Sequence, residues 1–331
     1  MKVLSLFDGI SCGMVALERA GIPVEKYVAY EIDENAIKVS KNNYPQIEHC
    51  GDVFQAQYNE GEFDLLIGGS PCTYWSIAQK NNRETTSSGF GWELFMHYVR
   101  ALKEAKPKYF LYENNKSMSS LIKQEITKQL GVEPIMIDSS LVSAQNRKRL
   151  YWTNIPNIEQ PLQKEIFIKD IIEKDVEYTF IPKEKLNNQV MTKNYLRWDI
   201  NGKGWKSQDQ RAYFLDGKSG TVDTGCAHKL KLFIGENTVR EFTQTELERL
   251  QTLPNGYTSI LGKSAAGKAI GNGWTVDVIS HILKHIPLYQ PNVCIYNDGL
   301  SCCYPFDDCM NCPAHPQSTD RYWGMTKGEI I

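Results

Sequence analysis

The regular alternation of short apolar runs with longer mixed segments constrains the fold more than any other feature of this sequence. Between Met1 and about Asn154, runs rich in β-branched and aromatic residues are separated by segments of helical length. This pattern is typical of βα units, which build a mostly parallel sheet with helices on both faces and ligands beyond the carboxyl ends of the strands. The predicted strands are Val3–Phe7, Tyr27–Glu31, a weak one at His49–Cys50, Phe63–Ile67, Tyr109–Tyr112, Ile135–Ile137 and Leu150–Trp152.

The residues that follow the first three predicted strands indicate a nucleoside pocket. The first strand leads into Phe7–Gly13, a glycine-containing turn where the backbone can approach a ligand before a helix begins. The second strand ends at Glu31, twenty-two residues after Gly9, where a carboxylate can bind ribose hydroxyls. The third ends at Gly51-Asp52, a second carboxylate at the same edge.

A cysteine and a glutamate follow the next two strands. The fourth strand leads through Gly68-Gly69-Ser70-Pro71 to Cys72, and the fifth is followed by Glu113-Asn114. A thiol on a Gly/Pro-shaped loop is exposed to act as a nucleophile, although most free cysteines are inert core residues. A thiol and a carboxyl group from adjacent strands suit covalent catalysis with acid assistance.

Taken in order, these motifs resemble those of the DNA cytosine-5 methyltransferase family, over nearly the whole chain up to about His285. The stretches that carry the resemblance are Phe7–Gly13, Glu31, Gly51-Asp52, Pro71-Cys72, Glu113-Asn114, Gln145–Arg149, Arg240-Glu241 and Gly271–Val276. The resemblance implies a Rossmann-like class I methyltransferase with a smaller target-recognition lobe. It also implies S-adenosylmethionine as cofactor, bound by Phe7, Asp8, Gly9, Ile10, Gly13, Glu31, Ile32, Asp52, Val53, Pro71, Leu94, Asn272, Trp274 and Thr275.

The resemblance also assigns catalytic roles. Cys72 would add to carbon 6 of cytosine, and Glu113 would hydrogen-bond or protonate ring nitrogen 3. Arg147 would contact the ring oxygen and the adjacent phosphate, while Arg149 and Gln145 would organise that site. Because a stacked base is out of reach of Cys72, the target cytosine would have to flip out of the duplex.

Three positions depart from the family pattern. Thr73 stands where bacterial members usually carry Gln, Asn115 stands where Val is common, and Trp274 replaces a smaller residue. The stretches around Cys72 and Trp274 look closer to the animal de novo enzymes than to many bacterial ones.

The lobe after the βα region has a different composition. Residues 181 to 240 hold eleven Lys or Arg against six Asp or Glu, with aromatic residues between them. We expect a loop-rich lobe that reads a short site in double-stranded DNA. The predicted domains are 1–155 (catalytic), 156–239 (target recognition), 240–290 (return to the catalytic domain, with helices at Thr243–Thr252 and Val276–Ile286) and 291–331 (tail). The predicted DNA contacts are Ser76, Arg83, Gln145, Trp198, Arg211 and Thr221.

The tail is rich in cysteine. Cys309-x-x-Cys312 has the spacing of half a zinc site, and two more cysteines could complete it. Structural zinc and reduced, unligated thiols both remain open. The four predicted ligands are Cys294, Cys302, Cys309 and Cys312.

Composition and the apolar runs indicate how the protein could bind a polyanion and where in the cell it works. Basic and acidic residues nearly balance, 37 against 39, so affinity for a polyanion must come from local clusters. Asp8 interrupts the first apolar run, which argues against a signal peptide, and no apolar run is long enough to span a membrane. We expect a cytoplasmic protein of bacterial or phage origin, and a restriction endonuclease is a candidate partner.

Two other functions are compatible with parts of this pattern. A transfer-RNA cytosine-5 methyltransferase would use the same thiol chemistry, but Thr73-Tyr74-Trp75 does not resemble the active-site loop of that branch. A catalytically silent DNA-binding regulator would keep the fold but lose the thiol or the acid, and this chain retains both Cys72 and Glu113.

Overall fold

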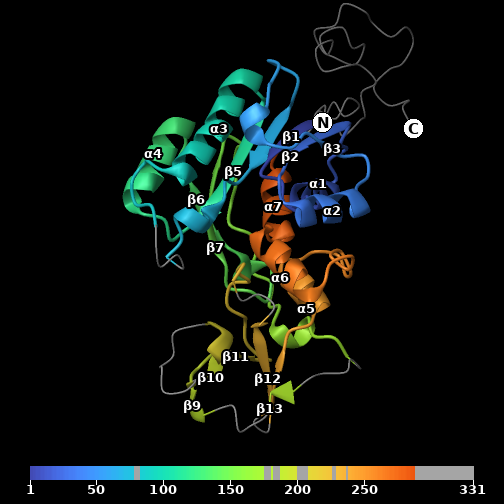
Figure 1. The fold of residues 1–331 in the computed structure, drawn as a ribbon, viewed down its shortest axis with the longest axis vertical. Coiled ribbons are helices and arrows are strands. Elements are labelled where there is room, and N and C mark those ends of the chain that lie inside the picture. Colours follow the sequence, from blue (N-terminus) through green and yellow to red (C-terminus); the bar gives the residue numbers. More distant parts are fainter. Residues whose placement is uncertain are drawn as a thin grey trace, which may run out of the picture. The chain divides into compact units, whose positions relative to one another are not determined.

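A seven-stranded sheet forms the centre of the larger lobe. The computed structural model describes residues 1–77, 83–174, 180–181, 187–199, 208–225, 229–235 and 238–287. The strands of the large sheet have the order β3-β2-β1-β4-β5-β7-β6 (Figure 1). Only β7 runs antiparallel to its neighbours, β5 and β6. The strands are β1 (Lys2–Leu6), β2 (Lys26–Tyr30), β3 (Glu48–His49), β4 (Leu65–Gly68), β5 (Tyr109–Asn115), β6 (Ile135–Asp138) and β7 (Lys148–Thr153).

Helices cover both faces of this sheet, as the sequence predicted. Successive residues of a strand point to opposite faces, so Val3 joins the core under one helical layer and Leu4 joins the core under the other. One layer contains α1, α2 and α7, and the other contains α3 and α4 (Figure 1). The helices are α1 (Cys12–Ala20), α2 (Glu34–Asn43), α3 (Phe90–Ala105), α4 (Ser120–Leu130), α5 (Gln244–Leu250), α6 (Lys263–Asn272) and α7 (Val276–Leu283).

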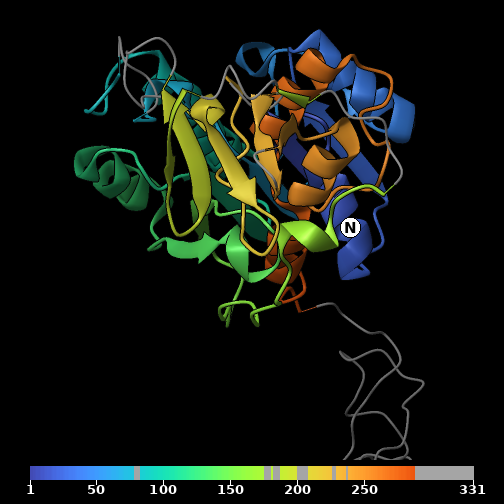
Figure 2. The ribbon, with the colours of Figure 1, turned by 90° about the horizontal axis from the view of Figure 1, so that it is seen from below.

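The segment after residue 240 returns to the large sheet. Helix α5 begins with the predicted capping box, in which Thr243 and Glu246 satisfy each other's backbone amides. Helix α7 then packs beside α1, and Arg19 forms an ion pair of 2.7 Å with Asp277. The orange helices accordingly lie beside the blue ones (Figures 1 and 2). Helix α6 has no counterpart among the predicted helices.

A second, smaller sheet of six strands builds the other lobe, with the order β8-β13-β12-β11-β10-β9. A small core of Leu196, Ala212 and Val239 lies within it. The sequence predicted a loop-rich lobe here, whereas the described part carries regular strands that are too short to show a period-2 pattern clearly. They are β8 (Phe180–Ile181), β9 (Asn187–Met191), β10 (Tyr195–Asp199), β11 (Arg211–Phe214), β12 (Lys231–Gly235) and β13 (Thr238–Glu241).

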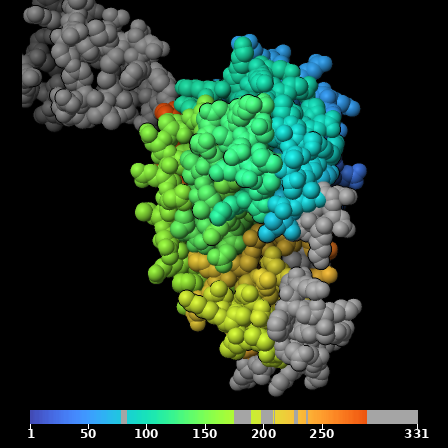
Figure 3. All heavy atoms as spheres, turned by 90° about the vertical axis from the view of Figure 1, so that its left-hand side faces the viewer, coloured from blue at the N-terminus to red at the C-terminus, as the bar shows by residue number. Residues whose placement is uncertain are grey.

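The small lobe continues directly from the surface of the large one (Figure 3). One short bridge between Gln145 and Ser219 ties the two lobes together, and Asn146 donates to the Ser219 carbonyl at 3.0 Å through its backbone amide. None of the helices within the described ranges is long and apolar enough to cross a membrane. The four predicted zinc ligands, Cys294, Cys302, Cys309 and Cys312, lie outside the described residues.

Candidate active site

The loop between β1 and α1 is held by a carboxylate that points into the protein. Phe7, Gly9 and Ser11 all have positive φ angles, so the chain turns sharply here. The carboxylate of Asp8 accepts hydrogen bonds from the hydroxyls of Ser5 and Tyr27 at 2.6 Å and from that of Ser11. Burial raises the pKa of Asp8, while these three donors oppose the shift. Asp8 therefore fixes the loop from within.

Glu31 lies at the end of β2, against the same loop. Its Oε2 accepts from the amide of Gly9 at 2.8 Å, and its Oε1 accepts from the amides of Ile32 and Asp33 at 2.8 Å. Burial raises the pKa of Glu31, and the three amides oppose the shift. Nothing lies within 4 Å of the place where a Cβ on Gly9 would stand, so its backbone faces open space. We call Phe7, Gly9 and Glu31 the Glu31 end of the site.

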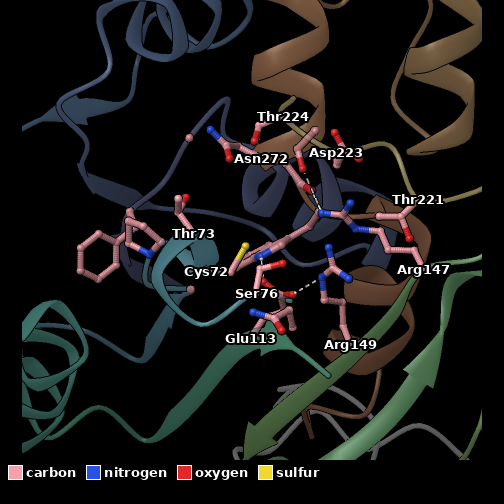
Figure 4. Close-up of a pocket in the computed structure, with 18 of the residues that line it drawn as sticks. Cys72, Thr73, Ser76, Glu113, Arg147, Arg149, Thr221, Asp223, Thr224 and Asn272 are labelled. Carbon is pink, nitrogen blue, oxygen red and sulfur yellow. Dashed lines mark hydrogen bonds and ion pairs between the residues drawn. The ribbon is translucent and has the colours of Figure 1, made fainter. Parts of the chain in front are cut away.

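Cys72 begins a short 3₁₀ turn, Cys72–Tyr74, directly after Pro71. The thiol is partly buried, and burial raises its pKa. The positive charge of Arg149 opposes that shift, whereas the negative charge of Glu113 adds to it. The close-up shows the sulfur beside Ser76 and above Glu113, with Arg147 and Arg149 farther to the right (Figure 4).

The carboxylate of Glu113 is held on both oxygens by side chains from distant segments. Arg149 on β7 places its Nε 3.0 Å from Oε1, and the indole Nε1 of Trp274 donates to Oε2 at 3.0 Å. The side chains of Glu113 and Arg149 are only 11% and 13% exposed, so water screens their charges weakly. We call Cys72, Glu113, Arg149 and Trp274 the Cys72 end.

Arg147 lies directly before β7, where the two lobes meet. Its buried guanidinium donates to the carbonyls of Val222, Gly271 and Gly273 at 2.8, 3.1 and 2.9 Å. Burial, reinforced by the charge of Arg149, lowers the pKa of Arg147 to about 10. It is therefore protonated at neutral pH and bridges the small lobe to the loop before α7. Arg149, two residues along, is the arginine beside Glu113 (Figure 4).

Both ends open into one cavity of about 1000 Å³. Predicted site residues that line it are Phe7, Asp8, Gly9, Glu31, Pro71, Cys72, Ser76, Glu113, Arg147, Arg149, Thr221, Asn272 and Trp274. Of the remaining predicted cofactor contacts, Ile10, Val53, Leu94 and Thr275 are buried away from it. Ile32 is 70% exposed outside the cavity lining, Asp52 caps the turn Val53–Gln55, and Gly13 makes room for Ile67.

Four of the predicted DNA contacts are not among the described residues that line the cavity. The amide of Gln145 is buried and bonded to Leu250, Gln251 and Val222, so it organises the protein interior. Arg83 donates to the carbonyls of Trp75 and Ser117. Arg211 stacks 5.0 Å from the ring of Tyr195. Trp198 belongs to β10, but its side chain lies outside the described part of the structure.

The cavity also has a lining that sequence reasoning missed. Asp223 and Thr224 reach it because the loop after Thr221 packs against Gly271, where an added Cβ would stand 2.7 Å from the Asp223 backbone. No local sequence signal predicts such a contact between lobes. Lys116 and Ser117 adjoin the motif at Glu113-Asn114 and could have been found by extending it, while Asn115, Asn146 and Lys148 belong to positions that the sequence analysis had already singled out.

Comparison with known proteins identifies the family to which this architecture belongs. The family model described as C-5 cytosine-specific DNA methylase matches residues 1–287. The chain belongs to this family. The resemblance inferred from the sequence motifs is thereby confirmed.

Curated relatives include phage and bacterial enzymes. The orphan methyltransferase M.SPRI of Bacillus phage SPR is 32% identical over 191 residues, which cover 53% of this chain and 42% of that protein. The type II methyltransferase M1.ScrFI of Lactococcus lactis subsp. cremoris is 27% identical over 318 residues, which cover 86% and 77% of the two chains. The matches thus span less than half of the phage relative and about three quarters of the lactococcal one.

Solved structures show the same fold. The Entamoeba histolytica methyltransferase EhMeth has a TM-score of 0.67 at 16% identity, over 86% of this chain and 97% of that one. The S. pombe Dnmt2 methyltransferase has a TM-score of 0.61 at 17% identity, with the same coverage. The predicted class I methyltransferase fold with a second, smaller domain is therefore confirmed.

Proposed function

We propose that this chain is a DNA cytosine-5 methyltransferase that modifies a flipped-out cytosine in a short duplex site through a covalent adduct on Cys72. The observation that carries the proposal is the meeting of a thiol, a carboxylate and a guanidinium at one end of a cavity. The other end of the same cavity offers a glycine turn and a ribose-binding carboxylate, Glu31.

The residues present fit S-adenosylmethionine. Oε1 of Glu31 accepts from two backbone amides, whereas Oε2 accepts from one and keeps a lone pair for a ribose hydroxyl. Gly9 exposes its backbone to the cavity, and Asn272 and Trp274 also line it. When bound, S-adenosylmethionine would supply an electrophilic methyl group that carbon 5 of the cytosine can take.

Cys72 and Glu113 would make carbon 5 reactive enough for that transfer. The Cys72 thiolate forms a bond to carbon 6, and the π electrons of the 5,6 double bond move to carbon 5. Glu113 holds a proton at ring nitrogen 3, which stabilises the resulting enamine. Arg149 stabilises both the thiolate and the orientation of the Glu113 carboxylate. Loss of the carbon 5 proton and departure of Cys72 restore the aromatic ring.

The partners follow from the same proposal. Lys116, Lys148 and Thr221 line the cavity, and the two exposed lysines could bind phosphates of duplex DNA. Arg211 and Trp198 on the small sheet are the proposed sequence-reading residues.

We place the protein in the cytoplasm of a bacterium, encoded by the bacterium or by a phage. A restriction endonuclease is a candidate partner. Zinc in the cysteine-rich tail stays a prediction that metal analysis of the purified protein would test.

The test is transfer of a tritium-labelled methyl group from S-adenosylmethionine to unmethylated duplex DNA, with transfer RNA as a parallel substrate. We expect label in DNA that is lost in Cys72→Ser. Cys50→Ser is the matched control, because Cys50 is a free, exposed cysteine outside the cavity. Label confined to transfer RNA would favour an RNA enzyme, and DNA binding without label would favour a silent regulator.

A further inference from the structure

The indole of Trp274 lines the cavity and also contacts the carboxylate of Glu113. Its Nε1 donates to Oε2 of Glu113 at 3.0 Å, across 161 residues of sequence. We propose that Trp274 is a positioning residue that fixes the carboxylate of Glu113 for its contact with ring nitrogen 3 of cytosine. The inference deepens the proposed function and rests on it.

The residues on both sides of Trp274 are held in place by hydrogen bonds. The carbonyl of Gly273 accepts from Arg147 at 2.9 Å and from the side-chain amide of Gln251 at 3.1 Å. The hydroxyl of Thr275 donates to the other side-chain atom of Gln251, Oε1, at 2.7 Å. Because Gln251 and Thr275 are buried, these bonds are protected from water. The indole therefore projects from a fixed platform.

Gly69 keeps the space around this bond open. A Cβ on Gly69 would stand 3.1 Å from Oε2 of Glu113 and 3.5 Å from Nε1 of Trp274. It would also stand 2.9 Å from the backbone carbonyl of Glu113, which cannot move aside within β5. A glycine thus stands where any side chain would press on the indole–carboxylate pair.

Two donors from different directions define the plane of the carboxylate. Arg149 alone would hold Oε1 and leave the group free to rotate about its last, broad torsion. The indole N–H on Oε2 removes that freedom, and catalytic groups must be held within about 10–20° of their productive geometry. Arg149 and Trp274 act only as donors, so neither competes with nitrogen 3 for a proton from Glu113.

The test uses exchange of tritium from carbon 5 of cytosine in duplex DNA, without S-adenosylmethionine. Addition of Cys72 to carbon 6 gives carbon 5 an electron pair that takes a proton from water. Reversal then releases either that proton or the tritium, together with the thiolate. Trp274→Phe keeps an aromatic wall but removes the N–H, and we expect exchange to fall roughly 10- to 100-fold, as for a lost hydrogen bond to a charged group.

The matched control is Trp152→Phe. The indole of Trp152 is fully buried and donates to the hydroxyl of Thr127 at 3.0 Å, so this variant also loses an indole hydrogen bond. We expect it to lower the melting temperature but to leave exchange within about twofold of wild type. The reason is that neither Trp152 nor its partner Thr127 lines the cavity or contacts Glu113.

A double-mutant cycle separates positioning from general damage. In a Glu113→Ala background, adding Trp274→Phe should change the residual exchange by less than about twofold, because coupling requires both partners. Wild-type exchange in Trp274→Phe, or an equal loss in both backgrounds, would overturn the inference. Absence of both exchange and methyl transfer in the wild-type protein would instead overturn the proposed function.

Discussion

The two ends of the cavity are built in different ways. At the Glu31 end, one carboxylate is held by backbone amides, two of which belong to the residues directly after it. At the Cys72 end, the carboxylate of Glu113 is held by side chains from β7 and from the loop before α7. The first arrangement is a property of local turns, whereas the second exists only when the whole lobe has folded.

This difference predicts how substitutions should separate binding from chemistry. Changes at the Glu31 end should weaken the cofactor complex and spare cofactor-free exchange at Cys72 to a large extent. Changes at the Cys72 end should slow cofactor-free exchange and largely spare the cofactor complex.

The largest effect is expected for Glu113→Gln. A neutral amide cannot hold a proton at ring nitrogen 3, and general acid catalysis contributes roughly 10²- to 10⁴-fold. We expect tritium exchange and methyl transfer to fall by about that factor. Glu104→Gln, an exposed glutamate at the far end of α3, is the matched control. Comparable loss of cofactor affinity in Glu113→Gln would show that the two ends are not separable.

A smaller effect is expected for Glu31→Gln, on binding. The amide group of Gln cannot accept from both sets of backbone N–H groups, so the loop at Gly9 loses support. We expect the Kd for S-adenosylhomocysteine to rise roughly 10- to 100-fold, measured by calorimetry, as for a lost hydrogen bond to a charged group. Glu34→Gln on the exposed start of α2 is the control. An unchanged Kd would contradict the placement of the cofactor at this end.

Arg149→Gln tests the electrostatics around the thiol. Burial raises the pKa of Cys72 and Arg149 opposes this, so removing the cation should raise the pKa further. We expect alkylation of Cys72 by iodoacetamide at pH 8 to slow roughly 3- to 10-fold, since only the thiolate reacts. The rate is followed on the Cys72 peptide by mass spectrometry between pH 7 and pH 10. In Glu113→Gln the profile should move to lower pH, and a shift in the same direction as Arg149→Gln would contradict the geometry.

Asp8→Asn should have the smallest effect, on stability. Because burial raises the pKa of Asp8 in the folded protein, its carboxyl group favours folding while protonated and loses that contribution as pH rises through the folded pKa. Asn cannot ionise. Relative to the variant, the wild-type free energy of unfolding should therefore fall as pH rises above about 4, the ordinary pKa of an aspartate. Urea unfolding of both proteins across this range measures it, and parallel curves would contradict the prediction.

The large sheet was predictable because its strands are buried on both faces and carry nearly continuous apolar runs. All seven predicted strands exist, and the predicted capping box at Thr243 and Glu246 begins α5. Helix α6 was not predicted, since its sequence, KSAAGKAIGN, has three alanines and two glycines in place of a clear apolar stripe. The short strands of the second sheet were missed because each contributes only a few residues to a small core.

The candidate site was predictable as far as motifs determine position. Cys72, Glu113 and Glu31 all line the cavity that the carboxyl ends of β2, β4 and β5 predict. The orientation of Arg147 was not predictable, because its three carbonyl partners lie between 75 and 126 residues away. The same holds for Trp274, which the motif placed at the cofactor, while the structure also places its N–H on Glu113.

The pairing of α1 with α7 also bears on how the chain is made. Arg19 meets a partner, Asp277, that the ribosome adds 258 residues later. Leu17 shares its core with Ile279 and Ile282, so the apolar side of α1 stays uncovered on the nascent chain until α7 has emerged. The contacts at the Glu31 end are the most local ones in the site. The helix that follows its glycine turn, α1, is nevertheless among the last to be covered. Translation that stops before α7 would leave an exposed apolar surface, which is prone to aggregation.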